Sequence, residues 1–141
     1  MKLQILLEKI HLLSTVHAHC DIPCGIYNPD DALQAAKTMR KMIQKIAALP
    51  KDDVNNRTRM IIVKEKHGKK CKHELLTLWT DYFKPEHLEK VPELHEKVWM
   101  AAKQVSKVKQ SLDEEAANKL VEMVEEIGKM FEKVEGTPKK E

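Results

Sequence analysis

The chain places a histidine and two cysteines within six consecutive positions, in the segment His19-Cys20-Asp21-Ile22-Pro23-Cys24. Gly25 follows directly, and proline and glycine together disfavour a regular helix and favour a compact turn. Such a turn would bring the two thiol groups close together. Thiolates and imidazoles are ligands of transition metals. A small disulfide and a pair of incidental thiols are the alternatives, and the spacing favours a metal site.

A leader of eighteen residues precedes this cluster. It ends in Val16-His17-Ala18, a pattern of small residues that superficially resembles a signal peptidase site. Glu8, Lys9 and His11 interrupt its apolar run, so it falls short of the roughly 20 apolar residues that span a bilayer. We predict that residues 1–18 are an amphipathic pro-segment removed on maturation, with export as the alternative.

Cleavage after Ala18 would change the donor atoms of the cluster. His19 would offer its new α-amine and its imidazole, Cys20 a thiolate and its backbone amide nitrogen, and Cys24 a second thiolate. A plane of two nitrogens and two sulfurs with an imidazole above it suits Ni(II) or Cu(II), whereas zinc prefers tetrahedral surroundings. The uncut chain lacks the amine, so the pro-segment would mask a ligand until it is removed.

Length and composition limit the possibilities further. A chain of 141 residues is sufficient for one domain with a core of its own. The 25 basic residues are balanced by 22 acidic ones, so a nucleic-acid surface is not expected. Three cysteines are too few for a disulfide scaffold. We therefore expect a reducing, cytoplasmic setting and no membrane partner.

Two helices are predicted in the first half of the remaining chain. Asn28-Pro29-Asp30-Asp31 is typical of a helix start, with Asn28 as the N-cap, Pro29 in the first helical position and two carboxylates near the positive end of the dipole. Apolar residues then recur at helical spacing until Pro50. The segment 53–83 predicts either one long helix or two helices broken at Gly68.

Two more helices follow a turn-rich connection between Pro85 and Pro92. Pro92 suits the first position of a third helix, whose apolar stripe reaches Val108. The segment 111–114 predicts a capping box at the start of a fourth helix, with Ser111 as the N-cap, and this helix ends before Gly136. No segment alternates with period two. We predict an all-α, antiparallel up-and-down four-helix bundle over residues 28–141, with a flexible metal-binding hook at 19–27.

Two separated motifs carry a resemblance to a known family. His-Cys-Asp-Ile-Pro-Cys-Gly-Ile-Tyr, residues 19–27, resembles the nickel hook of nickel-containing superoxide dismutases. Leu-Trp-Thr-Asp-Tyr-Phe-Lys-Pro, residues 78–85, and Glu-Lys-Val-Pro-Glu-Leu-His, residues 89–95, are similar to the central signature of that family. The resemblance extends at lower similarity across residues 19–141.

The resemblance implies an enzyme that converts superoxide to oxygen and hydrogen peroxide by Ni(II)/Ni(III) cycling, with one nickel ion per subunit. It implies a homohexamer and a maturation protease that cuts between Ala18 and His19. The implied ligands are His19 through its amine and axial imidazole, Cys20 through its amide nitrogen and thiolate, and Cys24 through its thiolate. Pro23 takes the place of the hook proline, where a cis peptide is expected.

Three further residues receive roles from the same resemblance. Tyr27 matches the tyrosine beside the open face of the metal, where a phenol can screen access and order water. Tyr82 is expected in the same pocket, although a half-buried tyrosine with an ordinary hydrogen bond explains it equally well. Asp21 is expected to fix the hook through hydrogen bonds to its backbone.

The sequence also departs from the family pattern. Ala35 and His67 occupy the nearest positions to the glutamate and the arginine that hold the axial histidine in the family, so that support must be rebuilt or absent. Gln34 is a candidate substitute. Cys71 matches no family ligand and is most simply a small apolar residue of the second helix, and His95 is expected to brace the bundle.

Two other functions compete with the enzyme. A carrier could bind nickel or copper through the same hook without turnover, and a helical interaction module could carry incidental thiols. The paired motifs argue against the module. Under the enzyme hypothesis, Lys64, Lys84 and other lysines are candidates for steering the superoxide anion toward the hook.

Overall fold

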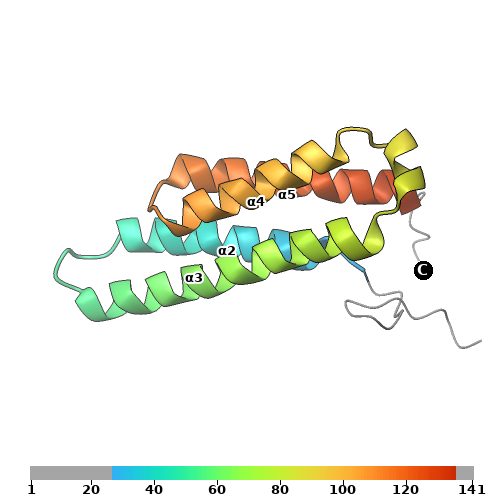
Figure 1. Cartoon of the computed structure of the whole chain (residues 1–141). Helices are drawn as coiled ribbons and strands as arrows, with labels where there is room; N and C mark the ends of the chain where they lie inside the picture. The colour runs from blue at the N-terminus through green and yellow to red at the C-terminus, as the bar shows by residue number, and fades with distance from the viewer. Residues whose placement is uncertain (1–26, 136–141) are drawn as a thin grey trace, which may run out of the picture.

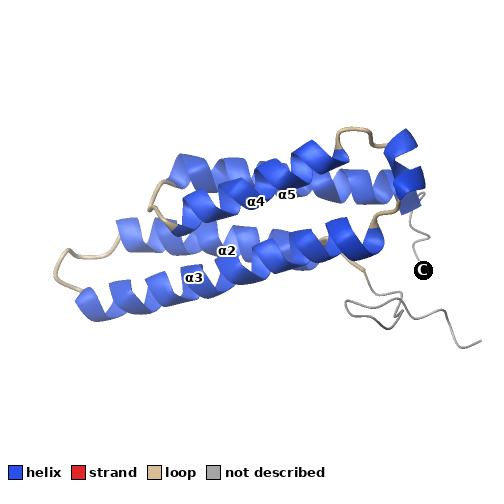
Figure 2. Ribbon diagram, viewed as in Figure 1, coloured by secondary structure: helices blue, strands red, loops and turns tan. Residues whose placement is uncertain are grey.

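The computed structural model describes residues 27–135 and is helical throughout, with no strand in that range (Figures 1 and 2). The predicted pro-segment, residues 1–18, and the predicted ligands at 19, 20 and 24 lie outside the described residues, as does Asp21. The all-α class is confirmed. The elements in chain order are α2 (Asp30–Ala47), α3 (Val54–Thr77), the π-helical turn η1 (Leu78–Tyr82), the 3-10 helix η2 (Pro85–Glu89), α4 (Leu94–Lys109) and α5 (Glu114–Glu135).

The four long helices form an up-and-down bundle. Helix α2 packs against α3 and α5, and α4 packs against the same two helices. Successive helices run in opposite directions, so the start of α2, the two short helices and the end of α5 lie at one end of the bundle (Figure 1). We call this the hook end, because the segment 19–24 precedes α2 there in the chain. The predicted antiparallel arrangement is confirmed.

The start of α2 uses the predicted capping residue with a small shift in register. The side-chain oxygen of Asn28 accepts a hydrogen bond from the backbone N–H of Asp30 at 2.8 Å. The prediction placed Pro29 in the first helical position, but the helix begins one residue later, at Asp30. It ends at Ala47, before Pro50. The buried stripe of α2 contains Ala32, Ala35, Ala36, Met39, Ile43 and Ile46.

Helix α3 passes through Gly68 without a break, so the single long helix is confirmed over two shorter ones. Gly68 is buried where α3 meets α4, and a Cβ atom there would lie 2.5 Å from Cγ of Lys109. The glycine therefore allows close approach of two helices rather than ending one. Beyond Thr77 the chain widens into η1 and then becomes extended at Phe83.

Two predicted helix starts are wrong in detail. Helix α4 begins at Leu94 and not at Pro92, because the chain makes a turn in which the N–H of Leu94 bonds the carbonyl of Val91. Helix α5 is capped by Asp113 and not by Ser111: the Asp113 carboxylate accepts from the N–H of Ala116 at 3.1 Å. The hydroxyl of Ser111 instead donates to a carbonyl in the last turn of α4.

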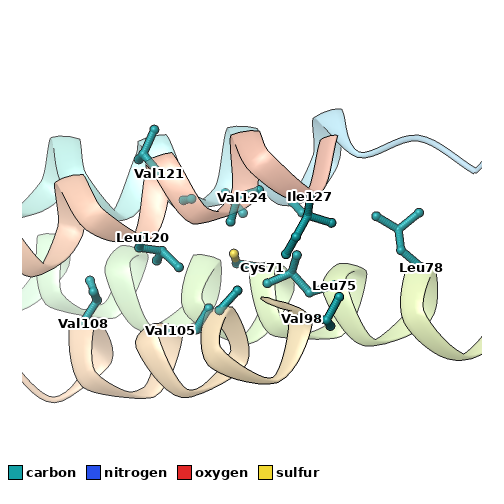
Figure 3. Close-up of a cluster of buried hydrophobic side chains, with 14 of the residues drawn as sticks. Cys71, Leu75, Leu78, Val98, Val105, Val108, Leu120, Val121, Val124 and Ile127 are labelled. Carbon is teal, nitrogen blue, oxygen red and sulfur yellow. The ribbon is translucent and has the colours of Figure 1, made fainter. Parts of the chain in front are cut away.

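The core lies along the bundle axis and draws on all four long helices. Cys71 is completely buried in it beside apolar side chains of the neighbouring helices (Figure 3). Burial raises the pKa of its thiol to about 12, so Cys71 stays protonated at neutral pH. Its predicted role as a small apolar residue is therefore consistent with its position.

Lys64 on α3 is the one buried lysine of the described residues. Its ammonium group donates to the carbonyl oxygens of Val108 and Ser111, each at 3.0 Å, and to that of Lys109. These carbonyls belong to the last turn of α4 and the loop after it, where the regular hydrogen bonding of the helix ends. Lys64 therefore closes the end of α4, and its steering role is wrong because its charge does not face the solvent.

No helix among residues 27–135 is both long enough and apolar enough to cross a membrane.

Candidate functional site: a tyrosine pocket at the hook end

A pocket of about 380 Å³ opens at the hook end, where the described chain begins. Its apolar wall is formed by the rings of Tyr27, Tyr82 and Phe131 and by Val134. Its charged and polar rim consists of Asp81, Lys84, His87 and Glu135. The pocket thus joins the residue that ends the predicted hook to η1, η2 and the last turn of α5.

Tyr27 and Tyr82 lie together in this pocket, with ring centroids 5.6 Å apart and ring planes inclined by 50°. They come from positions far apart in the chain, before α2 and at the end of η1. The up-and-down topology brings them together because α2 begins where η1 ends. The structure thus shows the two tyrosines side by side, and their expected place beside the metal stays a prediction.

The ring of Tyr82 is held by aromatic neighbours on several sides. It stacks on Phe131 with centroids 4.4 Å apart and meets Phe83 edge to face at 5.0 Å. The imidazole of His87 lies 5.9 Å from it. These contacts fix the plane of a half-buried side chain, so the direction in which its hydroxyl can point is restricted.

The hydroxyl of Tyr82 donates a hydrogen bond to Oε1 of Glu135 at 2.8 Å. Burial raises the pKa of Tyr82, and the hydrogen bond and the negative charge of Glu135 raise it further. Tyr82 is therefore a phenol, and not a phenolate, at any pH near neutrality.

The polar rim is organised by η2. Nδ1 of His87 accepts a hydrogen bond from the backbone N–H of Lys84 at 3.2 Å, which leaves Nε2 as the ring atom that can donate. The Lys84 side chain is exposed and lines the pocket. On η1 the carboxylate of Asp81 accepts from the hydroxyl of Thr80 at 2.8 Å. The rim therefore presents one lysine and one imidazole between two carboxylates.

His95 has a structural contact of the kind expected for it. Its Nδ1 accepts a hydrogen bond from Nε1 of Trp79 at 2.8 Å, and the two rings meet edge to face. This pair ties the end of the long second helical segment to the first turn of α4. The predicted bracing role fits these contacts.

The residues expected near the axial histidine do not form an obvious support. Ala35 is buried in the core, and a methyl group has no hydrogen bond to offer. Nδ1 of His67 lies 2.9 Å from the carbonyl oxygen of Val63 in its own helix. Gln34 is exposed on α2. None of the three is among the residues of the tyrosine pocket.

The donor chemistry points to the hook for metal binding. Within residues 27–135, no group of three or more histidine, cysteine, aspartate or glutamate side chains is placed to hold a metal ion. Cys71 is a buried thiol of raised pKa, whereas a metal ligand must be a thiolate. The sulfur and nitrogen donors at positions 19, 20 and 24 are of the types that suit nickel. These donors fit nickel, and residues 27–135 contain no other group of side chains placed to hold a metal ion.

Several pocket residues were not identified from the sequence. Asp81 lies within the 78–85 motif, but neither it nor Phe131 or His87 is given a site role by the sequence. Glu135 received no role. The order of the helices carries a partial signal for it, because an up-and-down bundle places the ends of its second and last helices at the same end of the bundle.

A family model of nickel-containing superoxide dismutases matches residues 14–135. A superoxide dismutase [Ni] of Streptomyces coelicolor is 40% identical over 117 residues, which are 83% of this chain and 88% of that protein. A superoxide dismutase [Ni] of Streptomyces seoulensis is 40% identical over 116 residues, which are 82% of this chain and 87% of that protein.

Comparison of the fold with solved structures also finds nickel superoxide dismutases. The native structure of a nickel superoxide dismutase superimposes with a TM-score of 0.79 and 37% identity, covering 84% of this chain and all of that one. A nickel-containing superoxide dismutase with nickel ligation corresponding to the oxidised state gives a TM-score of 0.78 at 38% identity, covering 83% and 98%. From the pocket, the donor set and these matches together, the chain belongs to the family of nickel-containing superoxide dismutases.

Proposed function

We propose that this chain is the precursor of an enzyme that converts superoxide to oxygen and hydrogen peroxide, and that cleavage between Ala18 and His19 completes its metal site. The ligands of one nickel ion per subunit are His19, Cys20 and Cys24. Nickel, when bound, supplies the one-electron couple that the reaction needs. Membership of the family and the position of the tyrosine pocket support this assignment.

The observation that carries the proposal is the pairing of Tyr27 with Tyr82. Tyr27 lies only three residues beyond Cys24, so the pocket adjoins the chain that leads from the ligands. Tyr27, Tyr82 and Phe131 line this space with aromatic rings, and Lys84 and His87 line it with groups that can attract an anion or donate a hydrogen bond.

The polar rim suits a reaction in which a small anion is consumed together with protons. Two superoxide anions take up two protons when they form oxygen and hydrogen peroxide. The ammonium group of Lys84 attracts the anion, and Nε2 of His87 is in a position to donate a hydrogen bond at the pocket. Tyr27 and Tyr82 position water in the same space, and Asp21 is assigned to holding the backbone of the hook.

We further propose that the mature subunits form a homohexamer in the cytoplasm after a maturation protease has acted. Large apolar side chains on the bundle surface support subunit contacts. Ile62 on α3 is 62% exposed and Trp99 on α4 is 53% exposed. The odd number of cysteines and the buried thiol of Cys71 fit a reducing compartment.

The test compares the chain that begins at His19 with the uncut chain, each loaded with nickel. The mature form is expected to bind one nickel per subunit and to accelerate the loss of superoxide, while the uncut form shows no turnover. Stoichiometric nickel without turnover in the mature form would instead identify a carrier. Absence of nickel binding in the mature form would contradict both functions.

A further inference from the structure

Glu135 stands at the very end of α5 and reaches across to η1. Its Oε1 atom accepts the hydrogen bond of the Tyr82 hydroxyl at 2.8 Å, although the two residues are 53 positions apart. The contact links the last turn of the bundle to the tyrosine pocket. Neither residue is a ligand of the proposed metal site, so the contact can be tested without the metal.

A phenol hydroxyl has one proton to donate and two lone pairs that accept. Because the proton of Tyr82 is directed to Glu135, the oxygen has only its lone pairs left for other partners. Stacking on Phe131 holds the ring in place, and the Glu135 carboxylate, which can only accept, keeps the hydroxyl proton on its side. Tyr82 is thus committed to accepting hydrogen bonds from whatever shares the pocket.

We propose that Glu135 is a positioning residue of the active site, which acts by holding the Tyr82 hydroxyl as a hydrogen-bond acceptor toward the pocket. The inference rests on the proposed dismutase function. Superoxide can only accept hydrogen bonds, whereas water and hydrogen peroxide can donate them. Tyr82 therefore selects water or the peroxide product, and attraction of the anion falls to other groups, such as Lys84.

The charges around Tyr82 allow a clear prediction of its titration. Among the charged residues of the pocket within residues 27–135, Glu135 on α5 is the one that bonds the Tyr82 hydroxyl. Loss of Glu135 lowers the pKa of Tyr82, while burial keeps that pKa above the ordinary value for tyrosine. The other groups that share the pocket with it are Tyr27 before α2, Asp81 on η1, Lys84 at the start of η2 and His87 on η2.

The chain has two tyrosines, so Tyr27→Phe leaves Tyr82 as the only one. In this background, tyrosinate absorbance of the metal-free full-length chain reports Tyr82 alone. We expect Glu135→Ala to lower the midpoint by about 0.5–1 pH unit. Glu135→Gln keeps an acceptor oxygen without the charge, so its titration midpoint should lie between those of the parent and Glu135→Ala. The matched control is Glu132→Ala, which removes an exposed carboxylate of the same helix outside the tyrosine pocket and should leave the midpoint unchanged.

Circular dichroism of the same samples shows whether each variant is still folded at its midpoint. If Glu135→Ala unfolds first, the more conservative Glu135→Gln decides the result. An unchanged midpoint in the folded Glu135 variants, or an equal shift in Glu132→Ala, would overturn the inference.

Activity of the mature nickel-loaded enzyme supplies the second readout. Glu135→Ala should slow superoxide loss by about threefold or more when Tyr82 is present, and should add nothing in a Tyr82→Phe background. Equal slowing in both backgrounds would show that Glu135 does not act through Tyr82. If the mature parent enzyme itself has no activity, the proposed function fails, while the titration still decides the placement of the Tyr82 proton.

Discussion

Nζ of Lys64 on α3 lies 3.0 Å from the carbonyl oxygen of Val108 on α4, inside the bundle. The lysine bonds two further carbonyls where α4 ends, and only 2% of its surface is exposed. Burial lowers the pKa of Lys64, but three acceptor oxygens compensate for the lost water. One cation therefore joins α3 to the end of α4, and α4 ends away from the hook end of the bundle (Figure 1).

Replacing this cation tests its role in stability. Lys64→Met keeps much of the apolar length but removes the side-chain donor to three carbonyls at the end of α4, so the free energy of unfolding should fall by about 1–3 kcal/mol. Urea denaturation measures the change. Lys66→Met, at an exposed position of the same helix, is the control and should have little effect. Equal stability of the two variants would contradict the capping role.

The cysteines should separate into two classes. Cys71→Ala removes one buried sulfur and leaves a small cavity, so it should reduce stability by about 1 kcal/mol. Nickel stoichiometry in the mature chain should not change, because a buried thiol of raised pKa is no ligand. Cys20→Ser and Cys24→Ser should each abolish stoichiometric nickel binding. Loss of nickel in Cys71→Ala, measured by elemental analysis of a folded sample, would refute this division.

Lys84 is the exposed lysine of the pocket rim and should influence the encounter with superoxide. We expect Lys84→Glu to reduce the second-order rate constant by about two- to fivefold at low salt, with the difference shrinking as ionic strength rises. Lys51→Glu makes the same change in net charge in the loop at the opposite end, and its effect should be smaller. If the two reversals have the same effect at every salt concentration, local steering by Lys84 is excluded.

The cap of α3 gives stability a dependence on acid pH. The Asp53 carboxylate accepts from the backbone N–H of Asn56 at 3.1 Å and from its side-chain amide at 2.8 Å. These hydrogen bonds, together with the charge of Arg57, outweigh a small effect of burial and hold the pKa of Asp53 below its ordinary value of 3.8. The unfolded state therefore binds the proton more readily than the folded state does. The stabilisation is present above pH 3.8 and is lost as the pH falls through the lower folded value.

Comparison of two neighbouring aspartates checks this prediction. Asp53→Ala should lower stability at pH 7 and should flatten the acid dependence of the unfolding midpoint. Asp52→Ala removes a carboxylate for which no hydrogen bond is observed, and should retain the acid dependence of the parent. Parallel curves for Asp53→Ala and the parent would show that the cap contributes nothing to the pH effect.

The apolar periodicity was sufficient to predict four helices and their order, because burial of one stripe per helix dominates a bundle of this size. Exact ends were less predictable. Ser111 and Asp113 both suit an N-cap, and the choice depends on the loop after α4, where Ser111 is turned back toward Lys107. Whether Gly68 would break the second helix could not be decided from the sequence, because its reason lies in the tertiary packing of Lys109 against it.

The site was predictable where it follows local motifs and unpredictable where it depends on packing. Tyr27 and Tyr82 were found through family motifs, and their proximity is now observed. The steering role expected for Lys64 failed because a lysine is normally exposed, and only the end of α4 shows why this one is buried. Glu135 had no motif, since its partner is chosen by how α5 meets η1.

The most direct test of the account is the paramagnetic resonance spectrum of the oxidised, nickel-loaded chain that begins at His19. The account predicts a Ni(III) signal with coupling to an axial nitrogen, lost in His19→Ala and absent from the uncut chain. A mature chain that binds nickel without such a signal, or an uncut chain that gives the same signal, would contradict the claim that cleavage at His19 completes the metal site.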